Sequence, residues 1–308
     1  MNHVEHSTLF EDLSEADSCL QAITSNLNLH PFPNIAKKAA EAFLRKSRKD
    51  KILPVLPAVI VNQLPLWPES VRCLPNEFLH SALFNAKNQN QPRSNYKEFC
   101  VPIIGDGQIT YSGEELRQDD ATVWLQLIHL SKERSLGATI DFTAYGFCKS
   151  INWPICKDSY IRLRSCLIRM QATALSLYSN RLKEGVSLSM IPRFRWRDEV
   201  TKRPLAKYQV ELAPELVRLF GDLQYTQIEW KQRLDLPRGL ATWLHGYYAS
   251  HRKPYPIKLS TLKKGAGLTT VMNKHLKENV KKALNELMRV EFLKSWEIVG
   301  ELIHVERF

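Results

Sequence analysis

Two stretches of the chain carry the same order of apolar and polar positions. Residues of the first recur as similar residues 117 positions later: Ile140 as Ile257, Phe142 as Leu259, Thr143 as Ser260, Leu163 as Val280, Leu167 as Leu284 and Met170 as Leu287. The same offset takes Lys157 to Lys274 and Arg164 to Lys281. We therefore expect one structural plan to occur twice, with an apolar core in each copy.

The periodicity of the first copy predicts two kinds of element. Apolar residues at helical spacing predict helices, and β-rich runs bounded by turn residues predict strands. The expected elements are a helix capped by Asp119 or Asp120, a strand at 139–142, a helix capped by Thr143, a helix at 157–172, and a hairpin of 174–179 with 186–196. Before this copy we expect a helix at 77–87 and a hairpin of 99–104 with 108–111.

The second copy predicts the same succession after a bridging strand at 208–212 and a short helix at 214–220. Its elements are a helix at 237–249, a strand at 257–259, a short helix capped by Ser260, a helix at 270–290, and a hairpin of 292–296 with 302–305. Helix, strand, two helices and hairpin is the order of a winged helix-turn-helix. The predicted fold is α+β, with tandem winged-helix domains.

The beginning of the chain has a different character. Acidic residues without a Lys or Arg occupy the part before residue 30, basic residues gather at 37–51, and prolines then recur through Pro68. Closely spaced prolines favour extended backbone. We expect a flexible N-terminal arm at 1–70, a first winged-helix domain at 71–222 and a second at 223–308. A tail without function is an equally open interpretation of the arm.

Composition narrows the class of protein. The 308 residues are 44% hydrophobic, with a formal charge of +11, which is typical of a globular protein with a polyphosphate partner. A basic protein without a nucleic-acid ligand remains the alternative. The six cysteines form no C-x-x-C pair, and the longest apolar run, Val55 to Val61, is too short to span a bilayer. We expect reduced thiols, a cytoplasmic location and no membrane contact.

The helix at 270–290 has the features of a DNA reader. Its apolar residues fall on one side, and Lys274, Lys277 and Lys281 fall on a flank beside them. Its first residues, Thr270, Asn273 and Lys274, are placed to bond base edges, while Lys277 and Lys281 would pair with phosphate. Lys263 and Lys264 of the preceding helix would contact the DNA backbone. The alternative is a solvated lysine face.

The first copy offers a second set of candidates. Its helix carries Lys157, Tyr160, Arg162, Arg164 and Arg169, and its wing region carries Arg193, Arg195, Arg197, Lys202 and Arg203. Arginines beside aromatic residues on a strand suit a backbone or minor-groove contact. Cys166, Ile168 and Ala172 widen the apolar side of the helix, however. Pairing of two protomers through this unit is therefore as plausible as DNA binding.

A short apolar segment lies in the arm, and little in the chain suggests catalysis. Gln63, Leu64, Leu66 and Trp67 could dock in the pocket of a partner, or Leu66 and Trp67 could pack on the globular part. There is no G-x-x-x-x-G-K-[ST], H-E-x-x-H or G-x-S-x-G motif. An origin-nicking enzyme would need His-hydrophobic-His near a Tyr, and the histidines do not form that triplet. We expect no enzyme and no cofactor.

Ordered blocks of the chain resemble one family. They are 64–70 (LPLWPES), 74–77 (LPNE), 81–84 (SALF), 115–120 (ELRQDD), 123–130 (VWLQLIHL), 147–149 (FCK) and 250–256 (SHRKPYP). Together they are similar to TrfA, the replication initiator of IncP-type broad-host-range plasmids. The resemblance covers about 62–308.

The resemblance implies a function. Proteins of this kind bind direct repeats, called iterons, at a plasmid origin, open the neighbouring AT-rich DNA and recruit the host replicative helicase. The partners implied are double-stranded iterons, the opened single strand, the helicase and a second copy, because such initiators switch between an inactive dimer and a DNA-binding monomer. Gln63 to Trp67 looks like the pentapeptide that docks on the sliding clamp, although Pro65 and Trp67 depart from its commonest form. A winged-helix transcriptional repressor of a plasmid operon remains the alternative.

Overall fold

The computed structural model describes most of the chain after residue 62. The described residues are 63–105, 107–134, 137–178, 185–198, 201, 203–215, 219–220, 225–269 and 272–308. The chain divides into two units, Met1–Ile60 and Val61–Phe308. Most of the expected arm thus lies outside the described residues. Its last part, from Gln63 onward, belongs to the same compact body as the rest of the described chain, Val61–Phe308.

The first half of the described chain is mixed α/β. Its elements are β1 (Val71–Pro75), α3 (Asn76–Leu79), β2 (Phe84–Asn85), β3 (Asn95–Val101), β4 (Gln108–Glu114), β5 (Leu116–Arg117), α4 (Gln118–Ser131), β6 (Ile140–Phe142), α5 (Ala144–Ser150), α6 (Lys157–Gln171), β7 (Ala174–Tyr178), β8 (Gly185–Leu188), β9 (Arg193–Arg197) and β10 (Pro204–Glu211).

The second half repeats part of this order. Its elements are β11 (Tyr225–Glu229), α7 (Trp230–Asp235), α8 (Leu240–Ala249), β12 (Ile257–Lys258), α9 (Leu259–Gly265), α10 (Asn273–Arg289), β13 (Leu293–Val299) and β14 (Leu302–Arg307). None of the helices in the described ranges is long and apolar enough to cross a membrane.

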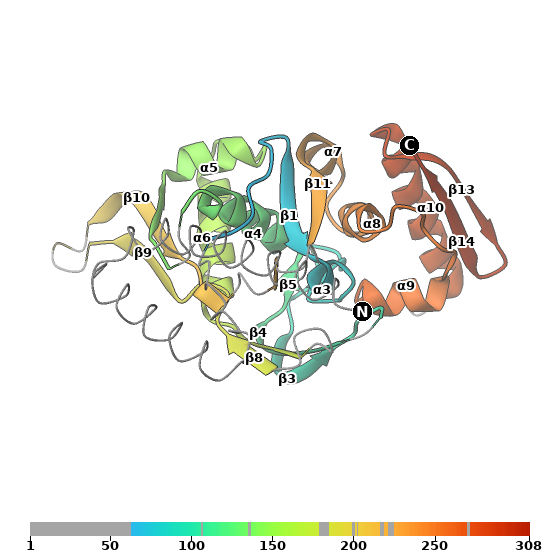
Figure 1. Cartoon of the computed structure of the whole chain (residues 1–308), viewed down its shortest axis with the longest axis horizontal. Coiled ribbons are helices and arrows are strands. Elements are labelled where there is room, and N and C mark those ends of the chain that lie inside the picture. The colour runs from blue at the N-terminus through green and yellow to red at the C-terminus, as the bar shows by residue number, and fades with distance from the viewer. Residues whose placement is uncertain are drawn as a thin grey trace, which may run out of the picture. The chain divides into compact units, whose positions relative to one another are not determined.

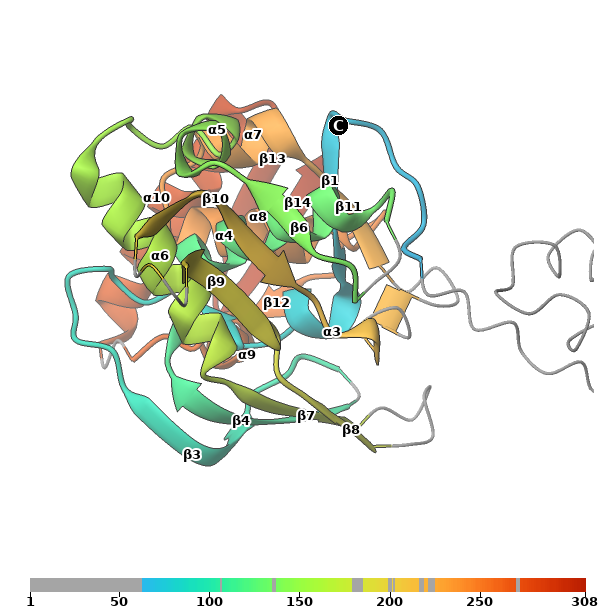
Figure 2. The same ribbon diagram turned by 90° about the vertical axis from the view of Figure 1, so that its left-hand side faces the viewer.

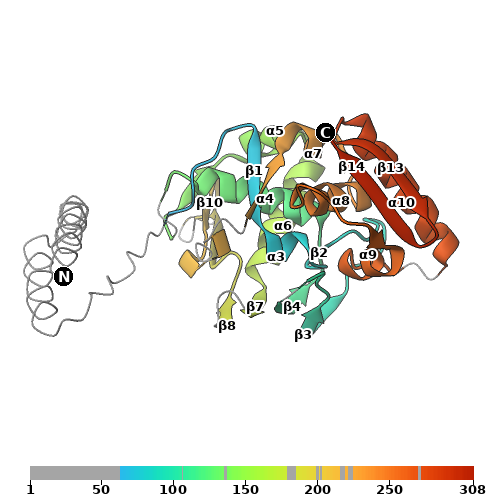
Figure 3. The same ribbon diagram turned by 45° about the vertical axis from the view of Figure 1, so that its right-hand side comes forward.

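Both copies end in an antiparallel three-stranded sheet of the same order. In the first copy the order is β6-β10-β9, and in the second it is β12-β14-β13. Figures 1 and 3 show α8, α9 and α10 next to the β13–β14 hairpin. The helix–strand–helix–helix–hairpin succession expected from the sequence is therefore present twice.

The prediction that 174–179 and 186–196 form the wing of the first copy is wrong. β7 and β8 do pair, but they extend a four-stranded sheet of order β3-β4-β7-β8, which lies along the bottom of Figure 2. Residues 193–197 form β9 in the other sheet, paired with β10. The chain leaves one sheet for the other at Met190–Pro192, because Met190 and Ile191 are buried in the core and Pro192 has no N–H for a ladder.

This extra hairpin explains where the repeat stops. Residues 172–192 separate α6 from β9, whereas only 290–292 separate α10 from β13. The offset of 117 therefore holds as far as the long helices and fails after them. Periodicity in the sequence does not show to which sheet an inserted hairpin belongs.

The repeated apolar positions form the two cores. All five apolar pairs at the offset of 117 are buried, with exposed fractions of at most 8%. In the first copy they belong to one hydrophobic cluster with α4, and in the second to another with α8. The repeat in the sequence therefore corresponds to two separate hydrophobic cores, one in each copy.

Several element ends differ from expectation. The helix expected at 77–87 ends at Leu79, because the chain beyond it forms β2, which pairs in parallel with β5. Helix α4 is capped by Arg117, whose N–H donates to Asp120 Oδ2 at 2.8 Å, instead of by Asp119 or Asp120. Thr143 caps α5 as expected, its hydroxyl accepting from Gly146 N at 3.0 Å.

In the second copy, the short helix also begins earlier than predicted. Helix α9 starts at Leu259 with Lys258 as its cap, so Ser260 is not the capping residue. Helix α10 begins at Asn273, and Thr270 lies outside the described residues. The last hairpin turns at Gly300 as expected, where φ is +61°.

The second copy packs directly against the segment that precedes the first copy. Trp243 Nε1 donates to Ser81 O at 3.1 Å, and Ala86 N donates to Ala266 O at 2.9 Å. A Cβ added at Gly265 would meet the Ile104 side chain at 2.3 Å, so Ile104 would have to shift to admit any larger residue there.

Equivalent core truncations in the two copies should be similarly costly. Leu167→Ala and Leu284→Ala should each lower the free energy of unfolding by about 2–5 kcal/mol, because both side chains are fully buried. Ile168→Ala, at a position 39% exposed, is the control and should cost less than about 1 kcal/mol. Urea unfolding followed by tryptophan fluorescence measures all three. A small loss for only one of the leucines would contradict equivalent cores.

Candidate nucleic-acid interface

Helix α10 has one buried side and one charged side. Its buried residues are Leu276, Val280, Ala283, Leu284 and Leu287. Lys274 and Lys281 are exposed, and a spacing of seven residues puts both on one flank. This arrangement leaves the outer surface of the helix free for a polyanion.

The other residues predicted around α10 are placed less uniformly. Lys277 is half-buried, and its ammonium donates to Gly300 O at 3.3 Å, which joins the helix to the turn of the β13–β14 hairpin. Lys264 is exposed on α9, and Lys263 beside it is half-buried. The side chain of Asn273 lies outside the described structure, as does Thr270.

Two arginines of α6 serve the fold. Arg162 Nη2 lies 3.0 Å from Asp119 Oδ2, and its guanidinium stacks over Trp153 at 4.4 Å. Arg169 is buried and forms 3.0 Å ion pairs with Asp120 and Glu114. Internal carboxylates bind both guanidinium groups, so a DNA contact of either arginine would compete with these ion pairs.

The remaining α6 candidates differ in exposure. Lys157 is exposed at the first turn, and Arg164 is half-buried. Tyr160 packs against the core of the first copy. Of these three residues, only Lys157 is exposed enough for its side chain to reach a phosphate freely.

Strand β9 presents the arginines of the first copy in a row. Arg193, Arg195 and Arg197 are two residues apart, so their side chains share one face of the strand. Arg193 also lies 3.7 Å from Glu211, and Phe194 is buried on the opposite face. Arg203 near β10 is exposed, and Lys202 lies outside the described residues.

The outer face of α6 is apolar where that of α10 is polar. Ile161 is 45% exposed and Ile168 is 39% exposed, and their counterparts at the offset of 117 are Glu278 and Asn285. Cys166, predicted to widen this apolar face, is instead buried in the core. The two long helices thus offer different surfaces.

The apolar segment of the expected arm is part of the fold. Leu64 and Trp67 are 2% and 5% exposed, whereas Leu66 is 69% exposed and Gln63 is also exposed. The expectation that all four are displayed for a partner is wrong for Leu64 and Trp67. Packing back onto the globular part, the alternative, holds for Trp67 but not for Leu66.

Hydrogen bonds hold this segment on α4. Trp67 Nε1 donates to His129 Nδ1 at 3.1 Å, and His129 Nε2 lies 2.8 Å from Glu69 Oε2. Lys132 pairs with the same carboxylate. These bonds lower the pKa of Glu69 to about 2, that from Lys132 contributing most. The partners are about 60 residues away, so local pattern does not reveal them.

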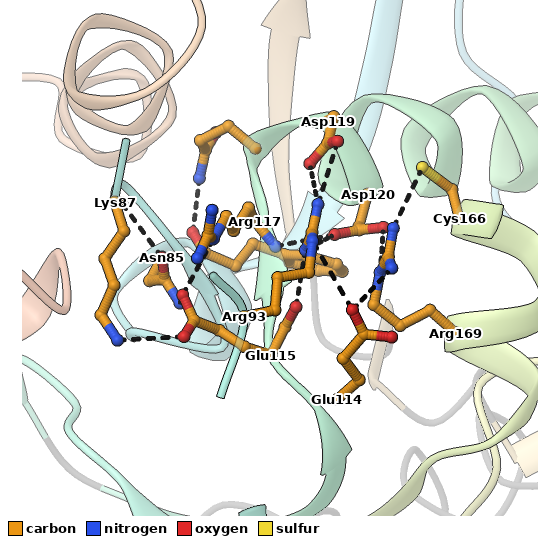
Figure 4. A network of polar contacts seen from close by, with 12 residues as sticks. Asn85, Lys87, Arg93, Glu114, Glu115, Arg117, Asp119, Asp120, Cys166 and Arg169 are labelled. Atoms are coloured by element: carbon orange, nitrogen blue, oxygen red, sulfur yellow. Dashed lines mark hydrogen bonds and ion pairs between the residues drawn. The ribbon is translucent and has the colours of Figure 1, made fainter. Parts of the chain in front are cut away.

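A buried polar network lies at the start of α4 (Figure 4). Glu115 accepts from Lys87 and Asn85 at 3.0 Å and from Arg117 at 2.9 Å. Burial alone would raise the pKa of Glu115, but these hydrogen bonds outweigh it and lower the pKa to about 2. This network was not predicted from the sequence, in which the only signal for it is the density of charges at 114–120.

Comparisons with known proteins agree on the family. A family model described as TrfA protein matches residues 33–307. The plasmid replication initiator protein TrfA of Escherichia coli is 32% identical over 272 residues, which cover 88% of this chain and 70% of that protein.

Solved structures share the fold at low sequence identity. Domains 2 and 3 of RctB match with a TM-score of 0.54 at 13% identity, over 76% of this chain and 98% of that one. The Pi initiator protein, crystallised in complex with iteron DNA, gives a TM-score of 0.49 at 12% identity over 78% of this chain and 99% of that one. The RctB likeness concerns the fold alone.

Removal of the Glu115 charge should change the response of stability to pH. Because its pKa is lowered from 4.5, ionised Glu115 stabilises the fold above about pH 4.5, and this stabilisation is lost as the pH falls towards 2. Glu115→Gln should therefore be less stable than the wild type at pH 7, with a difference that shrinks between pH 4.5 and 2. Urea unfolding at several pH values checks this. A difference that does not change with pH would contradict it.

Proposed function

The chain belongs to the TrfA family of plasmid replication initiators, and we propose that it starts replication by binding iteron repeats at the origin of its plasmid. The observation that carries the proposal is α10, whose exposed Lys274 and Lys281 lie beside a hairpin joined to the helix through Lys277. A helix with a basic outer flank, held by a buried opposite side, suits the major groove.

Each copy of the repeated plan is a winged helix in this proposal. The support is the common order of elements and the common order of the three-stranded sheets, β6-β10-β9 and β12-β14-β13. The wing of the first unit is then β9–β10, with its row of arginines, and that of the second is β13–β14. Units at 71–222 and 223–308 remain our division of the chain.

The two units take different parts in the proposed function. The second reads the iterons, because the outer face of α10 is polar and carries the free lysines. The first supports the DNA through Arg193, Arg195 and Arg197 and pairs with a second copy through α6. The exposed Ile161 and Ile168 on α6 support pairing, since exposed apolar side chains on one helix face favour a protein surface.

Opening of AT-rich DNA, recruitment of the helicase and recruitment of the sliding clamp complete the proposal. Clamp docking would use Gln63 and Leu66, which are exposed in the folded segment. Full engagement of the pentapeptide would require Leu64 and Trp67 to leave the core, at the cost of their buried apolar surface. Docking is thus coupled to local release of this segment from α4.

Loss of the α10 lysines should weaken origin binding in a salt-dependent way. In this proposal both exposed lysines contact phosphate, Lys274 in addition to any base edge. Lys274→Ala combined with Lys281→Ala should then reduce the magnitude of the slope of log affinity against log salt by about 2, because each lost phosphate contact removes about 0.9. Fluorescence anisotropy with origin DNA over a salt series measures this slope. Lys231→Ala, at an exposed position on α7, is the control and should leave the slope unchanged.

An unchanged slope in the double variant would remove α10 from the DNA interface. Permanganate probing of the same complexes separates initiation from repression. An initiator makes thymines in the AT-rich segment reactive, whereas a winged-helix repressor covers the duplex without opening it.

Leu66 tests the clamp proposal without disturbing the core. Leu66→Ala should reduce capture of the purified sliding clamp at least tenfold and leave the melting temperature unchanged, because the side chain is 69% exposed. Phe308→Ala, at another highly exposed apolar position, is the matched control. Equal capture of the clamp by both variants would refute docking through this segment.

A further inference from the structure

A concave site lies beside α10. It encloses about 780 Å³ and is formed by α10, by the residues that lead into α8, and by a loop of the first unit, Ala86–Gln91. The lining residues used below are Asn88, Gln89, Arg238, Asn279 and Lys282. None of them belongs to the interface assigned above.

This groove and the wing flank α10 on opposite sides. On the wing side, Lys277 bonds to Gly300. Asn285, whose Oδ1 accepts from Trp296 Nε1 of the hairpin at 3.0 Å, also lines the groove, so it lies between the two sides. On the other side, Asn279 lies about 200° around the helix from Lys277 and faces the groove. Figure 1 shows α10 between α8 and the β13–β14 hairpin.

The position of the groove matters because of the shape of DNA. A helix in the major groove, which is about 12 Å wide, has a phosphate strand along each flank. In the proposed complex, the wing contacts the DNA strand that runs along one flank of α10. The strand on the other flank would run along the groove.

The charges in the groove fit a phosphate strand. The ammonium of Lys87 is already bound by Glu115 at 3.0 Å, and Glu286 is bound by Arg289 at 2.7 Å. Arg238 and Lys282 are exposed, and they are the lining cations without an ion pair to a described residue. The groove therefore has a net positive charge.

The other polar side chains suit the same ligand. The amides of Asn88, Gln89 and Asn279 can donate to phosphate oxygens. Among the described residues, no aromatic side chain lines the groove. Unpaired bases bind chiefly by stacking on such rings, so the lining favours a duplex backbone over a single strand.

The first-unit wall of the groove is held rigidly. Arg117 Nη1 donates to the carbonyls of Asn88 and Gln91 at 2.8 and 2.9 Å, and its Nη2 donates to Pro92 O at 2.9 Å. Arg117 is itself held by Glu115 at 2.9 Å. These bonds hold the carbonyls of the loop, while the side chains of Asn88 and Gln89 remain exposed.

We propose that this groove holds the phosphodiester backbone of the DNA strand on the side of α10 opposite the wing. The loop Ala86–Gln91 of the first unit then contacts the same DNA segment that the second unit reads. The proposal rests on the proposed function, since it requires α10 to lie in the major groove.

Single substitutions of the two free cations test the proposal. Arg238→Ala and Lys282→Ala should each lower the salt slope of binding by about 1, and should weaken binding to origin DNA and to unrelated DNA by similar factors. Lys231→Ala, which removes an exposed lysine outside the groove, should change neither quantity.

A reversed charge on the loop tests the contribution of the first unit. Gln89→Glu should weaken binding about tenfold, because it places a carboxylate beside the phosphate strand. Gln227→Glu, at an exposed position on β11, adds the same charge elsewhere and should bind like the wild type. Both positions are exposed, so neither change should alter the melting temperature.

The outcomes separate this proposal from the one on which it rests. Failure of the wild type to bind origin DNA would overturn the proposed function. Binding that is weakened by the Lys274 and Lys281 substitutions, but not by those at Arg238, Lys282 and Gln89, would overturn the groove alone.

Discussion

Ion pairs buried at the start of α4 hold the first unit together. Arg93 and Arg169 both bind Asp120, and Arg93 also binds Asp119. The pairs join the segment before β3, the first turn of α4 and the last turn of α6. Buried charges are costly unless each is paired and hydrogen-bonded, and removal of one partner leaves the other uncompensated. The orientation of α6 therefore depends on electrostatics as well as on apolar packing.

Much of the fold could be predicted from local pattern. Helices α6 and α8 and the last hairpin follow from periodicity, and Thr143 follows from capping chemistry. Contacts between distant segments could not be predicted. The sequence shows Arg162 on a basic helix, but not that Asp119, 43 residues earlier, binds it. Likewise it does not show that β9 pairs with β10 instead of β8.

Only part of the candidate site could be predicted, because local pattern shows which residues of a helix are exposed but not which distant segments contact each other. Lys274 and Lys281 are exposed because α10 has a simple pattern, in which one buried stripe fixes what remains outside. Trp67 was placed in an arm because prolines surround it, yet burial of its ring and the bond to His129 keep it in the fold. When the local conformational preference of a short segment is weak, tertiary contacts determine whether it packs on the fold or extends into solvent.

The direct packing of the two units gives them a fixed separation. Trp243 is bonded across the contact to Ser81, and Gly265 lies so close to Ile104 that an added methyl group would displace the Ile104 side chain. In the proposed complex, surfaces joined in this way would contact two DNA segments at a fixed distance from each other. An added base pair between two contacted segments turns one away from the other by about 35°, a tenth of the duplex turn. In the proposed complex, the contact between the units would thus set the spacing of the two DNA segments that they contact.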